Sequence, residues 1–197
     1  MKINRTKNAA RNMVYGIVLK LYQIIVPFLM RTAMIYFMGV QYLGLNSLFT
    51  SILQVLNLVE LGVGSAMVYS MYRPIAEDNK EEICALMRLY RLYYRIIGMA
   101  IGILGIMVLP FLPYLIEGEI PNDVNIYILY LLNLGSTVLS YWLFAYRNCL
   151  LNAHQRNDVI NKIMMATTTV QYALQLIVLC FLKDYYLYLI ILLVTQA

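Results

Sequence analysis

Three charged side chains lie inside long apolar runs of this sequence: Lys20 and Arg31 in the first run, and Glu60 in the second. A charge inside the hydrocarbon core of a membrane is costly, and such residues commonly mark a substrate or ion pathway. Lys20 and Arg31 are eleven residues apart, so at 3.6 residues per turn they lie within about 20° of one helix face, with Pro27 between them. Because ammonium and guanidinium groups bind phosphate oxygens, the two residues predict a site for an anionic ligand.

Glu60 is accompanied by further polar residues in the second run. Asn57 lies on the same helical face, within about 60° of Glu60, and Gln54 lies near the depth predicted for Arg31. The predicted substrate-binding residues are therefore Lys20, Arg31, Glu60, Asn57 and Gln54. Two simpler interpretations stay open: Lys20 and Glu60 could form a structural ion pair at similar depth, and either cation could extend toward the nearer membrane surface.

Two later apolar runs also carry polar residues at helical spacing. These residues are Asn133, Thr137 and Ser140 in one run, and Thr168, Gln171 and Gln175 in the other. One such stripe is typical of hydrogen bonds between helices, whereas several in one bundle predict a water-filled cavity. The sequence contains no nucleophile paired with a base, no glycine-rich phosphate loop and no metal-ligand spacing. It therefore predicts a protein that is not an enzyme and has no metal site and no cofactor.

These residues must be positioned by helices that cross a membrane. Hydrophobic residues make up 62% of the 197 residues and charged residues 13%, and the mean hydropathy is +0.70. Soluble domains carry about 25% charged residues, and a membrane crossing needs roughly 20 apolar residues. The predicted fold is an all-α integral membrane protein, a six-helix transmembrane bundle with spans at 13–38, 43–71, 96–116, 125–145, 163–182 and 185–197.

The last of these spans contains 13 residues, or about 20 Å of helix, which is too short for a crossing. We therefore expect the chain to be the N-terminal fragment of a longer protein whose C-terminal bundle is missing. In the third span, Gly98, Gly102 and Gly105 predict a face that packs closely against another helix.

The distribution of cationic residues predicts the topology. Twelve Lys and Arg residues lie in the N-terminal segment and in the loops after the second and fourth spans, whereas Lys183 alone lies in a loop on the other side. Cytoplasmic loops are enriched in Lys and Arg, so the N-terminus is predicted to be cytoplasmic. The net charge of +5 then reflects topology, and no nucleic-acid partner is predicted.

The loop between the second and third spans is predicted to contain a helix at 79–95. Asp78 followed by Glu81 matches the capping-box pattern that begins a helix, and arginines follow on one side. An amphipathic helix of this kind is expected to lie in the membrane interface and to run into the third span. Its arginines would either anchor the chain there or contact a substrate head group.

The stretch 27–91 resembles the Wzx-type polysaccharide-biosynthesis flippases, within the exporter superfamily that includes the multidrug and toxin extrusion (MATE) proteins. The similar segments are Pro27 with Phe28, Tyr-Leu-Gly-Leu at 42–45, Asn-Leu-Val-Glu-Leu-Gly-Val-Gly-Ser-Ala at 57–66, and Tyr-Arg-Pro-Ile-Ala at 72–76. The resemblance implies one half of a MATE-like transporter in which two six-helix bundles surround a central cavity and work by alternating access.

The resemblance also implies the cargo, an oligosaccharide on a polyprenyl pyrophosphate that is moved across the cytoplasmic membrane for surface polysaccharide biosynthesis, such as O-antigen or capsule. Lys20 and Arg31 would hold the anionic head group, with Glu60 as their partner. Membrane lipid, a polysaccharide polymerase and assembly proteins are further implied partners. Two alternatives stay open: a cation or drug antiporter of the same superfamily, which the cationic stripe disfavours, and a membrane scaffold that transports nothing.

Overall fold

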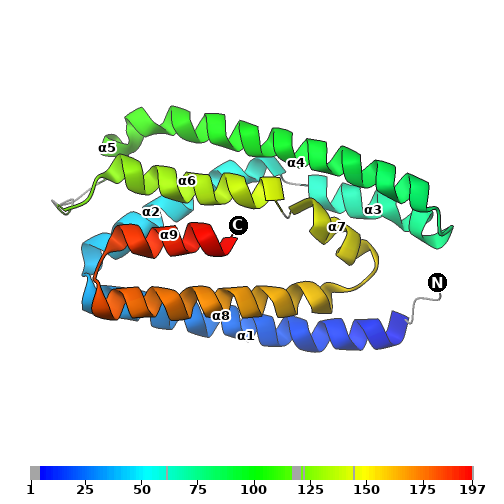
Figure 1. Ribbon diagram of the computed structural model, residues 1–197, viewed down its shortest axis with the longest axis horizontal. Coiled ribbons are helices and arrows are strands. Elements are labelled where there is room, and N and C mark those ends of the chain that lie inside the picture. The colour runs from blue at the N-terminus through cyan, green and yellow to red at the C-terminus, as the bar shows by residue number, and fades with distance from the viewer. Residues whose placement is uncertain (1–4, 61, 117–120, 122, 144, 197) are drawn as a thin grey trace.

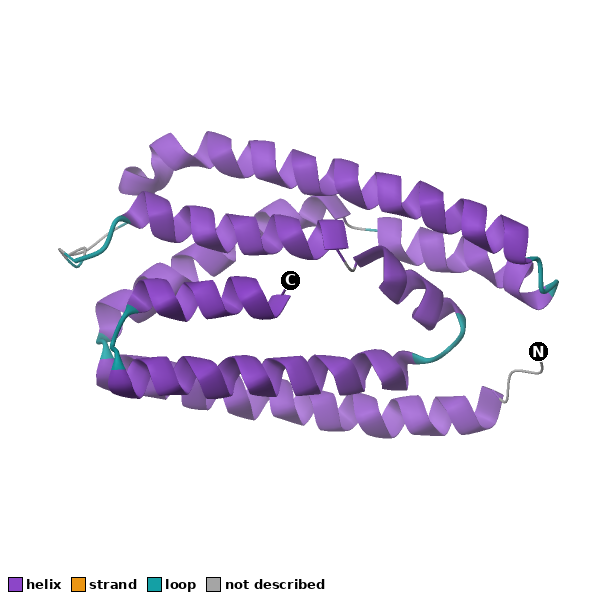
Figure 2. Ribbon diagram, viewed as in Figure 1, coloured by secondary structure: helices purple, strands orange, loops and turns teal. Residues whose placement is uncertain are grey.

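The computed structural model describes residues 5–60, 62–116, 121, 123–143 and 145–196, and every regular element among them is helical (Figures 1 and 2). In chain order the elements are α1 (Arg5–Phe37), α2 (Val40–Leu56), the 3-10 turn η1 (Asn57–Glu60), α3 (Val63–Ala76), α4 (Lys80–Val108), the 3-10 turn η2 (Leu109–Phe111), α5 (Leu112–Leu115), α6 (Ile126–Leu143), α7 (Ala145–Ala153), α8 (Asn157–Phe181) and α9 (Tyr185–Gln196).

The long helices run roughly along one direction and form an elongated bundle (Figure 1). α1 packs along α8, α4 packs against α6 and α3, and α9 contacts both α6 and α8, while the short helix α7 contacts α3, α4 and α8. The start of α1, the α3–α4 turn and the α7–α8 turn lie at one end of the bundle, and the α1–α2 and α8–α9 turns lie at the other. The segments rich in Lys and Arg therefore share one end, which is the predicted cytoplasmic end.

Four helical segments are long and apolar enough to cross a membrane: Arg11–Phe37, Lys80–Leu115, Ile126–Leu143 and Asn157–Phe181. Large apolar side chains cover their outer surfaces, as at Ile24 and Phe28 of α1, each 68% exposed. An apolar surface of this extent is unfavourable in water and is expected in lipid. The fold is therefore that of an all-helical membrane protein, while the six-span count and the cytoplasmic N-terminus stay predictions.

The second predicted span, 43–71, is divided in the structure, so the prediction of one continuous helix was wrong. α2 ends at Leu56, η1 follows, and α3 starts after Gly62, whose φ of 87° lies in the left-handed region. One left-handed residue turns the chain out of the α-helical path, and glycine adopts this conformation without steric strain. The span prediction rested on hydropathy, which carries no information about a single backbone angle.

We expect Gly62→Val to lower the free energy of unfolding by about 1.5 kcal/mol, because a β-branched residue is strained at positive φ. No described atom lies within 4 Å of the position a Cβ would take, so the loss comes from the backbone alone. Gly62→Asn is the matched control, since asparagine tolerates the left-handed region. Unfolding in mixed detergent micelles, followed by circular dichroism, measures both, and equal stability of the two variants would contradict this account.

Residues 79–95, predicted as an interfacial helix that runs into the third span, form the first half of α4, which continues without interruption to Val108. Its N-cap is one residue later than predicted: the Asn79 side chain accepts a 3.2 Å hydrogen bond from the Glu82 N–H, while Asp78 has a φ of 54°. This half of α4 lies beside α3 (Figure 1). The predicted continuation into the third span is therefore present, while the position of this half in the membrane interface stays a prediction.

The buried core lies where α2, α4, α6 and α9 meet. Phe49, Ile101, Leu129 and Leu189, one from each of these helices, are completely buried. The Tyr130 ring packs edge-on against Phe49, with the ring centroids 5.7 Å apart. The core therefore holds α2 against α6 on the side of the bundle away from the predicted cytoplasmic end.

Candidate functional site

A cavity of about 1030 Å³ lies between α3, α6 and α7, beside the break between α2 and α3. The elements η1, α3, α4, α6 and α7 and the start of α8 contribute to its wall. The described residues that line it are Asn57, Glu60, Gly64, Ser65, Val68, Tyr69, Tyr72, Tyr94, Thr137, Ser140, Tyr141, Ala145, Asn148, Cys149, Asn152 and Asn157. Because α3 and α7 run toward the predicted cytoplasmic end (Figure 1), the cavity occupies that half of the bundle.

The wall is polar and nearly uncharged. Asparagine amides, tyrosine rings and hydroxyls make up most of it, and among the described lining residues Glu60 alone carries a formal charge. Amides and hydroxyls both donate and accept hydrogen bonds, while tyrosine rings add flat apolar surface. Such a wall suits a ligand that is rich in hydroxyl groups and carries little charge of its own.

Glu60 is fixed in this wall by a tyrosine from α6. The Tyr141 hydroxyl donates a 2.6 Å hydrogen bond to Glu60 Oε2 and lies 3.4 Å from Asn57 Oδ1. A phenol has one proton to donate, so the shorter contact with the carboxylate is the hydrogen bond and the amide oxygen stays open to a ligand. The Tyr94 ring stacks on the Tyr141 ring, with centroids 6.2 Å apart, and this packing holds the hydroxyl in position.

The broken helix explains why Glu60 reaches the cavity. In one continuous helix its side chain would follow the face set by α2, which packs against α1 and α6. The 3-10 turn η1 and the left-handed Gly62 end that face and redirect the chain toward α7. Gly64 then adds no side chain, and a Cβ there would lie 3.4 Å from the Tyr94 hydroxyl oxygen.

The structure separates the predicted cations from the predicted acid. Lys20 and Arg31 are exposed on α1 and are not part of the wall around Glu60. Among the described residues no ion pair joins Lys20 to Glu60, nor does Arg31 form one. The reason lies in the packing, because α1 lies along α8 and meets α2 but does not pack against α3.

Arg31 borders a second, smaller hollow of about 520 Å³ along α1. Its described lining combines the guanidinium with Gln23 and apolar residues, including Pro27 and Phe28. Gln54, the fifth predicted residue, is exposed on α2 and belongs to neither lining. The predicted set therefore falls into a cationic group on α1, an acidic group at the helix break, and Gln54 apart from both.

Only some of the predicted polar stripes meet at the cavity. Thr137 and Ser140 join Glu60 there, as the prediction of a shared polar space requires. Asn133 and Gln175 are instead buried and donate to backbone carbonyls, Asn133 to Leu129 at 2.9 Å and Gln175 to Tyr188 at 3.2 Å. These two residues fit the other interpretation of a polar stripe, that its side chains form hydrogen bonds which stabilise helices and their packing.

Sequence reasoning did not single out the residues that give the wall its character. Ser65, Tyr69 and Tyr72 are spaced as one face of a helix, and Asn148 and Asn152 are four residues apart on another. This helical spacing could have been used to predict that each set shares one polar face. No such spacing relates Tyr94 to Tyr141, because they come from separate helices and meet only in the folded chain.

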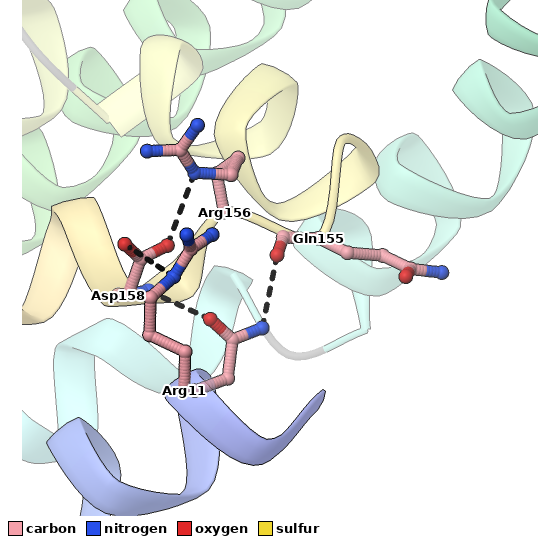
Figure 3. A network of polar contacts seen from close by, with 5 residues as sticks. Arg11, Gln155, Arg156 and Asp158 are labelled. Atoms are coloured by element: carbon pink, nitrogen blue, oxygen red, sulfur yellow. Dashed lines mark hydrogen bonds and ion pairs between the residues drawn. The ribbon is translucent and has the colours of Figure 1, made fainter. Parts of the chain in front are cut away.

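A polar network joins α1 to the start of α8 near the predicted cytoplasmic end (Figure 3). Asp158 accepts contacts from Arg11 at 2.9 Å and Arg156 at 3.1 Å, and its own N–H donates to Asn12 Oδ1 at 3.0 Å. The Asn12 amide in turn donates to the Gln155 carbonyl at 2.9 Å. The network therefore fixes the α7–α8 turn, which follows the α7 wall of the cavity, to the first helix.

Comparisons of the chain with protein-family models, with curated proteins and with solved structures found no match.

Proposed function

We propose that this protein is a flippase that moves an oligosaccharide linked to a polyprenyl pyrophosphate across the cytoplasmic membrane, by alternating access, for surface polysaccharide biosynthesis. The observation that carries the proposal is the polar cavity within a membrane-spanning bundle, whose wall is built of asparagines, tyrosines and hydroxyls. The resemblance of residues 27–91 to Wzx-type flippases points to the same cargo.

The cavity chemistry favours the glycan part of this cargo. Its volume of about 1030 Å³ is at the upper end of the range of small-molecule sites, roughly 300–1000 Å³. Several sugar rings could therefore be accommodated. Sugar hydroxyls can both donate to and accept from amide side chains, and Asn57 Oδ1 and the Glu60 carboxylate supply acceptors at the inner end of the wall.

The cations on α1 favour binding of the pyrophosphate part of this cargo. Lys20 and Arg31 lie on one side of α1, are exposed, and form no ion pair among the described residues. A guanidinium without a carboxylate partner can bind two phosphate oxygens at once. Glycan and pyrophosphate would then contact different helices, which a long, lipid-linked molecule can do and a small ion cannot.

One observation favours the second candidate, a cation or drug antiporter. Glu60 is the charged residue of the described cavity wall, and an acid in a polar cavity attracts cations. In that case Glu60 would bind the cargo or its coupling ion directly, and the cations on α1 would have no part in transport.

The flippase requires the cations Lys20 and Arg31 for transport, whereas the antiporter requires the carboxylate of Glu60. With the protein in vesicles, we expect Lys20→Gln and Arg31→Gln each to slow translocation of a polyprenyl-pyrophosphate-linked oligosaccharide about tenfold, the effect of losing one hydrogen bond to a charged group. Lys80→Gln, which removes an exposed cation at the start of α4, is the matched control and should change the rate less than twofold.

Other results would favour the antiporter or the scaffold instead. If Glu60→Gln abolished uptake of an organic cation while Arg31→Gln and Lys20→Gln were inert toward both cargoes, the antiporter would replace the flippase. Absence of lipid translocation and of cation uptake by the unmodified protein would contradict both transporters and favour the scaffold.

A further inference from the structure

Two arginines from different helices converge on one tyrosine hydroxyl on the outer side of α7. Arg91 Nη2 of α4 donates to the Tyr146 hydroxyl oxygen at 2.9 Å, and Arg147 Nε of α7 donates to the same oxygen at 3.2 Å. Both guanidinium groups also lie over the Tyr146 ring, with their central carbons 5.1 Å and 5.7 Å from its centroid. The Tyr146 side chain is buried, whereas both arginines are exposed.

The phenol oxygen cannot neutralise the two charges that it brings together. The hydrogen bond from Arg147 is the main cause that lowers the pKa of Tyr146; burial of the ring opposes it, and the bond from Arg91 adds to the lowering. Arg91 forms no ion pair among the described residues and makes one hydrogen bond there, although a guanidinium has five N–H donors. Two guanidinium groups therefore lie close together in fixed geometry, and Arg91 keeps donors that no described residue uses, which suits an anion with several oxygens.

The cluster lies at the level where α4 enters the apolar part of the bundle. Four residues after Arg91 comes Arg95, the last charged residue of α4, and the helix from residue 96 onward is apolar. The Trp142 indole N–H donates to the Arg95 carbonyl at 3.3 Å, and the Trp142 side chain is 42% exposed. Arginine and tryptophan together are typical of the boundary between lipid head groups and acyl chains.

We propose that Arg91, Tyr146 and Arg147 form a binding site for the phosphate group of an anionic phospholipid in the leaflet at the predicted cytoplasmic end. The phosphate would accept hydrogen bonds from both guanidinium groups. Below it, the acyl chains would lie against the exposed apolar side chains of α4, among them Met99, Ile103 and Ile106, which are 49%, 56% and 56% exposed.

A bilayer lipid fits this site better than the transported cargo does. None of Arg91, Tyr146 and Arg147 belongs to the cavity lining, whereas Asn148, Cys149 and Asn152 from α7 do. At 100° per residue, Arg147 lies about 140° around α7 from Asn152 and about 100° from Asn148. The site therefore lies outside the cavity wall, and the proposal is independent of what the cavity carries.

Arg91→Gln tests the site, and Arg88→Gln is its control, because it removes the same charge one turn earlier on α4. Arg88 is exposed, and the hydrogen bonds to Tyr146 among the described residues come from Arg91 and Arg147. Native mass spectrometry of the detergent-solubilised full chain, titrated with phosphatidylglycerol or phosphatidylcholine, measures binding of each lipid. We expect Arg91→Gln to weaken phosphatidylglycerol binding about 30-fold, as for charge-assisted hydrogen bonds, and to leave phosphatidylcholine binding unchanged. Arg88→Gln should lose at most about fivefold, the effect of one unspecific surface cation.

Two results would overturn the proposal. Equal losses in Arg91→Gln and Arg88→Gln would mean that the helix attracts anionic lipid by its total charge, without a defined site. Displacement of phosphatidylglycerol by millimolar inorganic phosphate would mean that the site recognises a free anion. Retention of the lipid under phosphate, with circular dichroism showing unchanged helix content in both variants, supports a lipid site.

Discussion

Asp158→Ala is expected to lower the free energy of unfolding by about 3 kcal/mol. The Asp158 carboxylate is buried, with 2% of its side chain exposed, and it contacts both Arg11 and Arg156 (Figure 3). Removing one partner of a buried ion pair commonly costs 3–5 kcal/mol, because the remaining charge loses its compensation. The side chains of Arg11 and Arg156 are 29% and 46% exposed, so water replaces part of the lost contact and the lower end of that range applies.

Glu77→Ala is the matched control for this prediction. Glu77 forms an ion pair with Arg73 at 2.9 Å, the same length as the Arg11–Asp158 contact, but both of its members are largely exposed. Exposed pairs at this helical spacing contribute about 0.3–0.5 kcal/mol. Denaturation of both variants in mixed micelles, followed by circular dichroism, provides the comparison. Losses of similar size would show that the Asp158 network adds no more than an ordinary surface contact.

Some features of this network can be predicted from the sequence, and others cannot. Arg11 belongs to the cationic N-terminal segment and Arg156 to the cationic loop after the fourth predicted span. In the structure the start of α1 and the α7–α8 turn lie at one end of the bundle (Figure 1). The common contact of the two arginines with Asp158 could not be predicted, because it depends on how α1 packs along α8. Periodicity indicates which face of a helix is polar, but not which other helix that face meets.

The same limit decides how much of the candidate site could be predicted from the sequence. One cavity is lined by Asn57, Glu60, Thr137 and Ser140, each of which helical spacing had placed in a polar stripe. The expected partner Lys20 lies elsewhere, because the comparison of depths assumed that 43–71 was one straight helix. The left-handed Gly62 invalidates that assumption, and Tyr141 occupies the place expected for the cation.

The small-residue face of α4 is confirmed, and it leads to the second large effect. Gly105 approaches α6 so closely that a Cβ added there would lie 2.4 Å from Cδ1 and 3.1 Å from Cγ of Leu134. Leu134 is 4% exposed and has little room to move. Overpacking of a well-filled core costs about 1–3 kcal/mol, so Gly105→Ala is expected to be about 2 kcal/mol less stable than the unmodified protein. Gly102→Ala is the control, since its Cβ would lie 3.6 Å from Val138, an ordinary van der Waals distance.

A double variant separates overpacking from other effects of the substitution. Leu134→Ala alone removes buried methyl groups and should cost about 3 kcal/mol. In Gly105→Ala combined with Leu134→Ala, the new methyl group occupies space that the leucine has vacated, so the clash disappears and part of the cavity is filled. The combined loss should therefore be smaller than the sum of the two single losses by about 1–2 kcal/mol, a coupling typical of residues in contact. Strictly additive losses would mean that the loss in Gly105→Ala does not come from a clash with the Leu134 side chain.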